Sequence, residues 1–143
     1  MKMTPPAKII RVLVADDSPT ALRSVCDYLE FAGGFEVVGT ASDGLNAVQL
    51  ATARKPDLVL LDLSMPRVNG LEAALQIRLS SPDLRVIIFS ELNGLSLGEE
   101  CRRYGADSFI HKSHLPDGLI SEIDRLFALD GRPRPKLSPI SPP

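Results

Sequence analysis

Five short apolar runs recur along this chain, and the segments between them have the periodicity of helices. The runs occupy residues 9–15 (IIRVLVA), 35–41 (FEVVGTA), 58–61 (LVLL), 85–89 (RVIIF) and 108–111 (SFIH). Runs with little polar alternation are typical of strands buried on both faces, and strands that alternate with helices form parallel sheets. The sequence therefore predicts an α/β fold: a doubly wound, five-stranded parallel sheet with helices on both faces.

The first helix has the clearest boundaries. Ser18 is a good N-cap, Pro19 suits the first helical position, and Gly33 and Gly34 end the helix. Four further helices are predicted from apolar residues at helical spacing: Ala47, Leu50 and Ala51, closed by residues 55–57; Leu71, Ala74 and Leu75; Leu97, Cys101 and Tyr104, with Gly105 as the C-cap; and Leu119, Ile123, Leu126 and Phe127, ending before Gly131.

Composition excludes several classes of protein. The chain has 143 residues, which suits one domain, and its formal net charge is −2 with no basic stripe, which argues against direct nucleic-acid binding. No apolar run approaches the roughly 18 residues that span a bilayer, and the N-terminus lacks the apolar middle of a signal peptide. Cys26 and Cys101 are predicted to serve as small buried residues with reduced thiols. We therefore expect a cytoplasmic protein without membrane contact.

The expected domain organisation is a disordered head at residues 1–8, one folded domain at 9–129 and a proline-rich tail at 130–143. Residues 131–143 hold five of the twelve prolines and three basic residues, but no acid. Such a composition cannot pack a core, which favours a disordered linker or solubilising segment over a docking segment.

Chemically active side chains follow four of the five predicted strands. Asp16 and Asp17 follow the first strand, Asp62 the third and Ser90 the fourth, and Lys112 comes just after the fifth. Each alone has an ordinary structural explanation, such as favouring a helix N-terminus or capping a turn. Ligands of open parallel sheets bind beyond the carboxyl ends of the strands, so these groups should meet there. Complementary chemistry from four strands indicates a site.

The residue types in this group suit a phosphoryl group and Mg²⁺. Clustered carboxylates repel one another unless a cation joins them, and their oxygens suit Mg²⁺. A phosphoryl group held there would accept a hydrogen bond from Ser90 and lie beside the positive charge of Lys112. Asp62 would be the nucleophile, since a carboxylate can form an aspartyl phosphate.

The chain resembles the receiver domain of bacterial two-component response regulators. The matching motifs are VLVADDSP, PDLVLLDLSMPRVNG, VIIFS and GADSFIHKS, and the resemblance extends from Ile9 to about Leu129. It implies a flavodoxin-like fold with strand order 2-1-3-4-5. It also implies phosphorelay signal transduction rather than an enzyme with turnover, because a receiver takes one phosphoryl group and loses it slowly.

The resemblance assigns the phosphoryl chemistry to individual residues. It makes Asp62 the phosphoacceptor and Lys112 the lysine that contacts the phosphate. It implies a Mg²⁺ ion held by Asp16, Asp17 and Asp62 together with the backbone carbonyl of Ser64. The donor in such proteins is a histidine kinase or phosphotransfer protein, and sometimes a small acyl phosphate.

The resemblance also implies a switch. Ser90 matches a hydroxyl that is drawn toward the added negative charge of about −1.5 to −2. Phe109 matches an aromatic ring that moves into the vacated space, although a plain core aromatic is the alternative. The face around the fourth helix, fifth strand and fifth helix would then change shape for an output partner or a homodimer.

Two positions depart from the family pattern. Glu91 follows Ser90 where alanine or glycine is usual, and its charge predicts slower or weaker phosphorylation or an altered phosphoryl lifetime, unless the side chain points to solvent. Ser113 follows Lys112 where a cis proline is common; a non-proline cis bond costs roughly 2.5–4 kcal/mol, so a trans bond and a different loop path are expected.

Two other functions remain open from the sequence. Glu91 is compatible with an atypical receiver that binds a partner without phosphorylation. A phosphohydrolase of the haloacid-dehalogenase type also uses an aspartate after a strand, but it would require a second aspartate where this chain has Ser64. His111 and His114 lack further ligands at metal-binding spacing, so they are predicted to be strand-end or solvent-facing residues.

Overall fold

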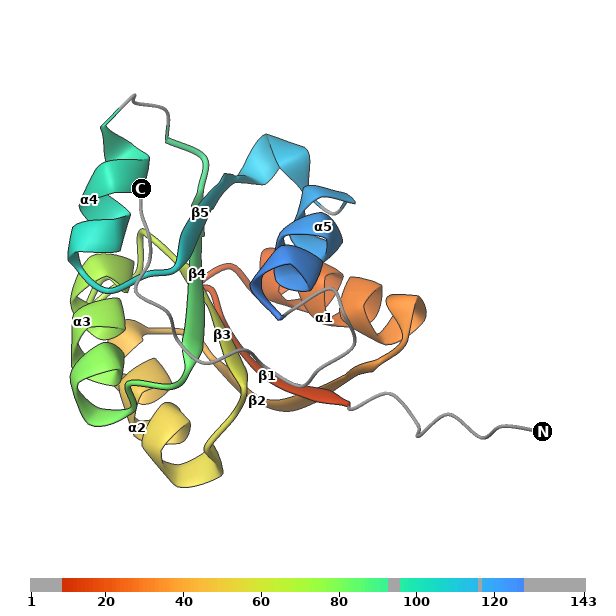
Figure 1. The fold of residues 1–143 in the computed structure, drawn as a ribbon, viewed down its shortest axis with the longest axis horizontal. Helices are drawn as coiled ribbons and strands as arrows, with labels where there is room; N and C mark the ends of the chain where they lie inside the picture. Colours follow the sequence, from red (N-terminus) through yellow and green to blue (C-terminus); the bar gives the residue numbers. More distant parts are fainter. Residues whose placement is uncertain (1–8, 93–95, 116, 128–143) are drawn as a thin grey trace.

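The computed structural model describes residues 9–92, 96–115 and 117–127, and the predicted disordered head and tail lie outside these ranges. Within them the chain alternates strands and helices as predicted (Figure 1). The elements are β1 (Ile10–Ala15), α1 (Pro19–Ala32), β2 (Phe35–Ala41), α2 (Gly44–Arg54), β3 (Leu58–Asp62), α3 (Gly70–Ser80), β4 (Arg85–Ser90), α4 (Leu97–Arg103), β5 (Ser108–His111), the 3₁₀ turn η1 (Lys112–His114) and α5 (Asp117–Leu126).

The five strands form one parallel sheet in the order β2-β1-β3-β4-β5, which is the order that the resemblance implied. From β1 the chain moves outward to β2 and then returns to build β3, β4 and β5 on the other side of β1. The strand order therefore reverses between β1 and β3, and a ligand of an open α/β sheet binds beyond the carboxyl ends at such a point.

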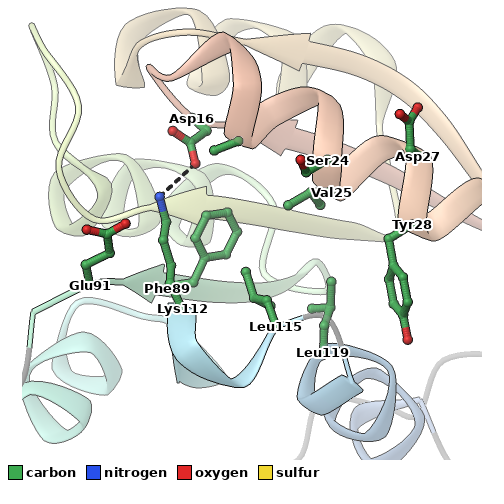
Figure 2. A pocket seen from close by; sticks show the side chains of 11 residues that line it. Asp16, Ser24, Val25, Asp27, Tyr28, Phe89, Glu91, Lys112, Leu115 and Leu119 are labelled. Atoms are coloured by element: carbon green, nitrogen blue, oxygen red, sulfur yellow. Dashed lines mark hydrogen bonds and ion pairs between the residues drawn. The ribbon is translucent and has the colours of Figure 1, made fainter.

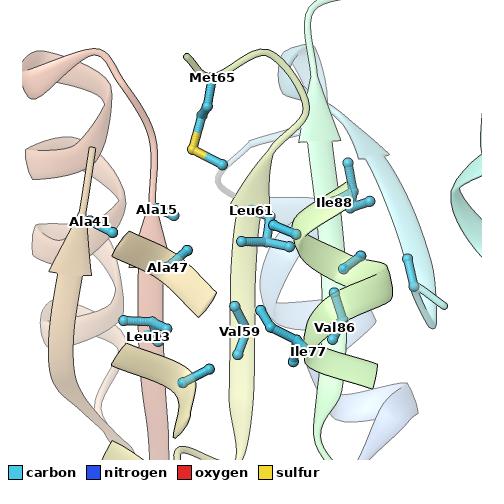
Figure 3. Packing of buried hydrophobic residues seen from close by; sticks show 14 of the residues in the cluster. Leu13, Ala15, Ala41, Ala47, Val59, Leu61, Met65, Ile77, Val86 and Ile88 are labelled. Atoms are coloured by element: carbon cyan, nitrogen blue, oxygen red, sulfur yellow. The ribbon is translucent and has the colours of Figure 1, made fainter. Parts of the chain in front are cut away.

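Two hydrophobic cores pack against the two faces of the sheet. Helices α2, α3 and α4 cover one face, and α1 and α5 cover the other (Figure 1). Figure 3 shows the first core, in which alternate strand residues such as Leu61 and Ile88 meet Ala47 of α2 and Ile77 of α3. The second core joins the other strand residues to Leu29 of α1 and Ile123 of α5. Central strands buried on both sides explain the continuous apolar runs.

Three helices begin with a side-chain cap of the same kind. The predicted N-cap Ser18 accepts a hydrogen bond from the backbone N–H of Ala21, and Asp43 and Asn69 cap α2 and α3 in the same way. Each cap satisfies one of the N–H groups that a helix N-terminus leaves free. The helices that follow β1, β2 and β3 therefore start at defined points near the carboxyl edge of the sheet.

The structure corrects two predictions of burial. The second strand was expected to be buried on both faces, but most of β2 is only half-buried because it lies at the edge of the sheet. Cys26 was expected to be buried and is partly exposed on α1, whereas Cys101 is buried in the first core as predicted. Local periodicity in the sequence does not distinguish β2 or Cys26 from segments and residues that are fully buried.

The structure also corrects several boundaries. β1 begins at Ile10 rather than at residue 9, and β3 and β4 extend one residue beyond the apolar runs 58–61 and 85–89, so that they end in Asp62 and Ser90. Tyr104, not Gly105, is the C-cap of α4. Phe127 is buried as expected but lies just after the last residue of α5.

Arg78 ties α3 to the opposite, amino-terminal edge of the sheet. Its guanidinium pairs with Asp107 at 2.7 Å and donates to three backbone carbonyls, those of Gly105, Pro82 and Leu84. This edge is therefore closed by a structural polar network, which leaves the carboxyl edge as the place for chemistry. Among the described residues, no helix is long and apolar enough to cross a membrane.

Candidate functional site

The sheet brings the predicted site residues together at its carboxyl edge. Asp16 directly follows β1, and Asp62 ends the adjacent β3, so the two carboxylates lie on either side of the point where strand order reverses. Ser90 ends β4, and Lys112 directly follows β5. Every one of these positions was predicted from the sequence, and their convergence follows from the strand order.

Three carboxylates form the centre of the site. Asp16, Asp17 and Asp62 each offer an oxygen within 4.8 Å of the others. Asp16 and Asp62 are buried, with 1% and 5% of their surface exposed, while Asp17 is exposed. Three hard oxygen ligands that meet with one side open to solvent suit a divalent cation such as Mg²⁺, which keeps several of its waters.

Asp16 is held firmly on both of its oxygens. One oxygen accepts a hydrogen bond from the backbone N–H of Ser18 at 2.9 Å, which fixes the carboxylate against the start of α1. The other accepts from Lys112 Nζ at 3.0 Å. The Asp16 side chain therefore connects the first strand with the chain segment that follows the last one.

Lys112 lies between the carboxylates and an aromatic ring. Its Nζ is 3.7 Å from Asp62 Oδ1 and 5.4 Å from the centre of the Phe89 ring. Burial alone would lower the pKa of Lys112, but the hydrogen bond to Asp16 and the negative charges of Asp62, Asp16 and Glu91 outweigh it and raise that pKa. Lys112 is therefore a fixed positive charge at neutral pH.

Asp62 is a buried carboxylate in surroundings that disfavour its negative charge. Burial and the charge of Asp16 raise the pKa of Asp62 to about 6, although Lys112 and a hydrogen bond with the Ser64 backbone act in the opposite direction. The site thus holds more negative charge than Lys112 neutralises. This excess is what a bound cation would relieve, so the residues present fit Mg²⁺.

Ser90 and Phe109 lie on the other side of the sheet edge from Lys112. Side chains along a strand point alternately to the two faces of the sheet, so Ser90 lies on the same face as Ile88, which belongs to the first core. Phe109 packs against this core on the α4 side. Ser90 is buried, and its hydroxyl accepts a hydrogen bond from the backbone N–H of Leu92 at 2.9 Å. Phe109 is half-buried where it packs against the first core.

Glu91 lines a cavity of about 580 Å³ that runs from the carboxylates into the groove between α1 and α5. Figure 2 shows Glu91 beside Lys112 at the end of the cavity that holds Asp16, with Tyr28 at the far end. Its side chain is exposed, yet its charge contributes to raising the pKa of Lys112. Glu91 therefore borders the site, as the sequence predicted, and remains open to solvent.

A second hollow of about 510 Å³ lies on the Asp17 side, where the loop after β3 contributes Ser64, Met65 and Asn69. Ser64 itself is exposed. The carboxylates are therefore approached from two sides, by the groove between α1 and α5 and by the loop between β3 and α3.

Sequence reasoning missed two features of the site. Gly70 packs so closely that a Cβ there would lie 2.5 Å from the backbone carbonyl of Asp62. His111 bonds to both loops that border the site, through Glu91 and Ser113. The signal for Gly70 was the motif NG before a helix, while nothing local in the sequence distinguished His111 from a solvent-facing histidine.

Comparison with known proteins agrees with this geometry. The family model for the response regulator receiver domain matches residues 12–124. Among curated relatives, the chain is 34% identical over 142 residues to a protein-glutamate methylesterase/protein-glutamine glutaminase of Clostridium acetobutylicum, covering 93% of this chain and 41% of that protein. It is 31% identical over 116 residues to the chemotaxis protein CheY of Thermotoga maritima, covering 81% of this chain and 96% of that one.

Solved structures give the same result. The receiver domain of NarL from Mycobacterium tuberculosis superposes with a TM-score of 0.79 at 31% identity, covering 89% of this chain and all of that chain. A Borrelia burgdorferi CheY, solved in a complex with CheX, BeF3 and Mg, superposes with a TM-score of 0.79 at 28% identity, covering 83% and 90%.

The chain spans about two fifths of the methylesterase, so the match concerns one domain of that longer protein. The part that matches carries the carboxylates, the hydroxyl and the lysine of the site. With its strand order, its acidic pocket of Asp16, Asp17 and Asp62, and a family match over most of its length, the chain belongs to the response regulator receiver domain family.

Proposed function

We propose that this receiver domain accepts a phosphoryl group on Asp62 and thereby switches a surface that binds a partner. The observation that carries the proposal is the position of Asp62, which ends β3 inside the acidic cluster with Lys112 3.7 Å away. No other carboxylate of the cluster combines burial with free access to the site: Asp16 is bonded on both oxygens, and Asp17 is exposed.

The transfer is a single displacement at phosphorus. An oxygen of the ionised Asp62 forms a new bond to phosphorus while the bond from phosphorus to the donor atom breaks. The electron pair of that bond leaves with the donor, which is a histidine nitrogen of a kinase or phosphotransfer protein, or the carboxylate of an acyl phosphate. Lys112 stabilises the negative phosphoryl oxygens, and Asp16 keeps Lys112 directed toward Asp62.

Asp16, Asp17 and Asp62 would hold Mg²⁺, with the backbone carbonyl of Ser64 as a further ligand. Bound there, the ion neutralises negative charge on the carboxylates and on the phosphoryl oxygens. The excess of negative charge around Asp62 supports this assignment, as does the Mg that accompanies the Borrelia CheY.

Ser90 and Phe109 would convert the added charge into a change of surface. The Ser90 hydroxyl accepts a hydrogen bond from Leu92 and keeps its own proton available for donation to a phosphoryl oxygen. A shift of Ser90 toward the site would open space on the α4 side, where Phe109 is only half-buried. The face formed by α4, β5 and α5 would then bind an output protein or a second copy. The similar Borrelia CheY was solved in a complex with another protein, CheX, which supports a role in protein binding.

The first experiment is intact-mass spectrometry after incubation with acetyl phosphate and Mg²⁺. We expect the mass of one phosphoryl group on the wild type, none on Asp62→Asn, and one on the control Asp83→Asn, which removes an exposed carboxylate at the opposite edge of the sheet. Equal labelling of wild type and Asp62→Asn would contradict the proposal, because the acceptor would then lie elsewhere.

Glu91 favours a second candidate, a receiver that binds its partner without phosphorylation. Its carboxylate borders the cavity beside Lys112 and would repel an incoming phosphoryl group. If the wild type stays unlabelled, Glu91→Ala is the next protein to test, with Glu91→Gln as the variant of equal size. Labelling of both would indicate a receiver obstructed by charge, and labelling of neither would favour the phosphorylation-independent module.

If the wild type is labelled, the same variants measure how strongly Glu91 limits the reaction. We expect Glu91→Gln and Glu91→Ala to be labelled several times faster than the wild type at low salt, and the difference to shrink as salt screens the exposed charge. Equal rates for all three proteins would mean that Glu91 acts only as a solvated side chain.

A further inference from the structure

His111 connects the chain segments that follow Ser90 and Lys112, the residues whose hydroxyl and amine are proposed to bind the phosphoryl group. It is the last residue of β5 and pairs across the sheet with Ser90, the last residue of β4. Its ring Nε2 lies 3.0 Å from the backbone carbonyl of Glu91, and its Nδ1 lies 3.1 Å from the backbone N of Ser113 and 2.7 Å from Ser113 Oγ. One imidazole thus bonds to the residue after Ser90 and to the residue after Lys112.

The hydrogen-bond partners fix the tautomer of this ring. A carbonyl can only accept, so Nε2 must carry the hydrogen that is donated to Glu91. A backbone N–H can only donate, so Nδ1 must be the unprotonated nitrogen that accepts from Ser113. Both contacts are therefore made together by the neutral ring with its hydrogen on Nε2. Ser113 supplies an N–H that a proline at this position would lack.

We propose that His111 is a positioning residue for phosphorylation, which holds the backbone beside Ser90 and the backbone beside Lys112 as one unit. The inference rests on the proposed function. Ser90 and Lys112 lie on opposite sides of the sheet edge, Ser90 as the last residue of β4 and Lys112 directly after β5. They must nevertheless reach oxygens of the same phosphoryl group, so a contact between the segments that follow them would help to keep both side chains in place.

Among the residues that the structure describes, the other bonds of Ser90 and Lys112 do not join these two segments. Lys112 is anchored through its side chain to Asp16 of the first strand, and the Ser90 hydroxyl is anchored within its own segment to Leu92. Beyond the last ladder pair, Ser90 with His111, the two backbones are joined by the imidazole. Removing the ring should therefore leave the carboxylates, the ladder and the fold in place, while the segments that begin at Glu91 and Ser113 are held less firmly to one another. The Ser90 hydroxyl, which is bonded to Leu92 in the first of these segments, and the Lys112 side chain would then be less well placed.

Four variants test the bridge by the rate of labelling with acetyl phosphate and Mg²⁺. His111→Ala removes both contacts. His111→Asn places an amide oxygen near the position of Nδ1 and keeps the Ser113 contact alone, while His111→Gln places an amide nitrogen near Nε2 and keeps the Glu91 contact alone. His114→Ala is the matched control, because it removes the other imidazole of the same turn, whose ring centre lies 6.4 Å from that of His111.

We expect His111→Ala to be labelled about five- to tenfold more slowly than the wild type. His111→Asn and His111→Gln should both stay slow, because neither joins the two segments, and His114→Ala should keep the wild-type rate. The shift in Tm caused by Mg²⁺ should be unchanged in the His111 variants, which shows that the carboxylates are intact. If His111→Ala does not fold, the Asn and Gln variants carry the test.

Three results would overturn the inference. They are a wild-type rate in His111→Ala, full recovery in either the Asn or the Gln variant, and an equal loss in His114→Ala. A ring ¹⁵N spectrum gives an independent check, since it must show hydrogen on Nε2 and not on Nδ1 of His111. If the wild type itself takes up no phosphoryl group, the proposed function is wrong and so is this role of His111. If the wild type is labelled and the His111 variants are labelled at the same rate, only the role of His111 is wrong.

Discussion

At the scale of single residues, Asp62 is placed where its charge is unfavourable. The last residue of a fully buried strand is a carboxylate, and burial together with the neighbouring Asp16 raises its pKa to about 6. Such a residue destabilises the folded state unless a cation or a covalent group changes its charge. Perturbed groups of this kind gather at functional sites because the function requires the strained arrangement.

This cost predicts how stability depends on pH without Mg²⁺. The pKa of about 6 in the folded state lies above the ordinary value of 3.8, so the folded protein binds this proton more tightly than the unfolded chain does. The resulting gain in the free energy of unfolding is complete below about pH 4 and is lost as the pH rises to about 6. Asp62→Asn removes the charge, so in EDTA at pH 7 it should be more stable than the wild type by up to about 2 kcal/mol.

Urea unfolding at several pH values measures this difference. The gain should shrink to near zero at about pH 4, and the control Asp83→Asn, which changes an exposed aspartate at the opposite edge of the sheet, should not be stabilised to the same extent at pH 7. A variant that is less stable than the wild type at pH 7 would show that the Asp62 charge is already compensated in the protein alone.

At the scale of elements, close packing of the β3–α3 turn sets the position of Asp62. A Cβ on Gly70 would lie 2.5 Å from the Asp62 carbonyl and 2.8 Å from the Leu63 Cα, and a Cβ on Gly44 would lie 1.8 Å from the carbonyl of Val68. The starts of α2 and α3 are thus packed directly against the backbone of this turn. This close packing limits how far Asp62 and Ser64 can move relative to one another.

Two glycine substitutions should have opposite effects. Gly70→Ala forces the turn away from β3 and should destabilise the protein by about 1–3 kcal/mol and slow labelling of Asp62. Gly98→Ala lies in α4, where the nearest atoms to a new Cβ are 3.9 Å away, and should stabilise by up to about 1 kcal/mol.

The urea denaturation midpoints show directly whether each variant is less or more stable than the wild type. A Gly70→Ala protein as stable as the wild type would mean that the turn adapts without strain and does not fix the position of the aspartate.

In the molecule as a whole, the sheet lies between two hydrophobic cores, and its amino-terminal and carboxyl edges carry different groups of polar residues. The amino-terminal edge is closed by Arg78 and Asp107, and the carboxyl edge collects the carboxylates and the lysine. Binding at the carboxyl edge therefore acts on a preformed site, so a ligand stabilises the entire fold through mass action.

Mg²⁺ should accordingly raise the Tm of the wild type. At a hundred times its Kd the gain is about 2.7 kcal/mol, and NaCl of equal ionic strength should not reproduce it. Asp17→Asn, which removes the exposed carboxylate of the cluster, should weaken the effect without lowering the Tm measured in EDTA. An equal rise in Tm for Asp17→Asn would exclude that carboxylate as a ligand.

Local patterns in the sequence were enough to predict the class of fold and the group of polar residues at the strand ends. Apolar runs, caps such as Ser18 and turn glycines depend on neighbours within a few residues, and for that reason the order of elements was predictable. Asp16, Asp62 and Lys112 could be recognised because parallel strands end at one edge, whatever the details of packing.

Features that depend on residues far apart in the chain could not be predicted from local sequence patterns. The half-buried β2 and the partly exposed Cys26 follow from their places on the sheet edge and on α1, which local periodicity does not encode. The raised pKa of Asp62 and the two bonds of His111 arise between segments that meet only when the sheet is assembled. Interactions between residues close in the sequence determine where the helices and strands form. The distances between side chains of different strands are set only when those strands pack together.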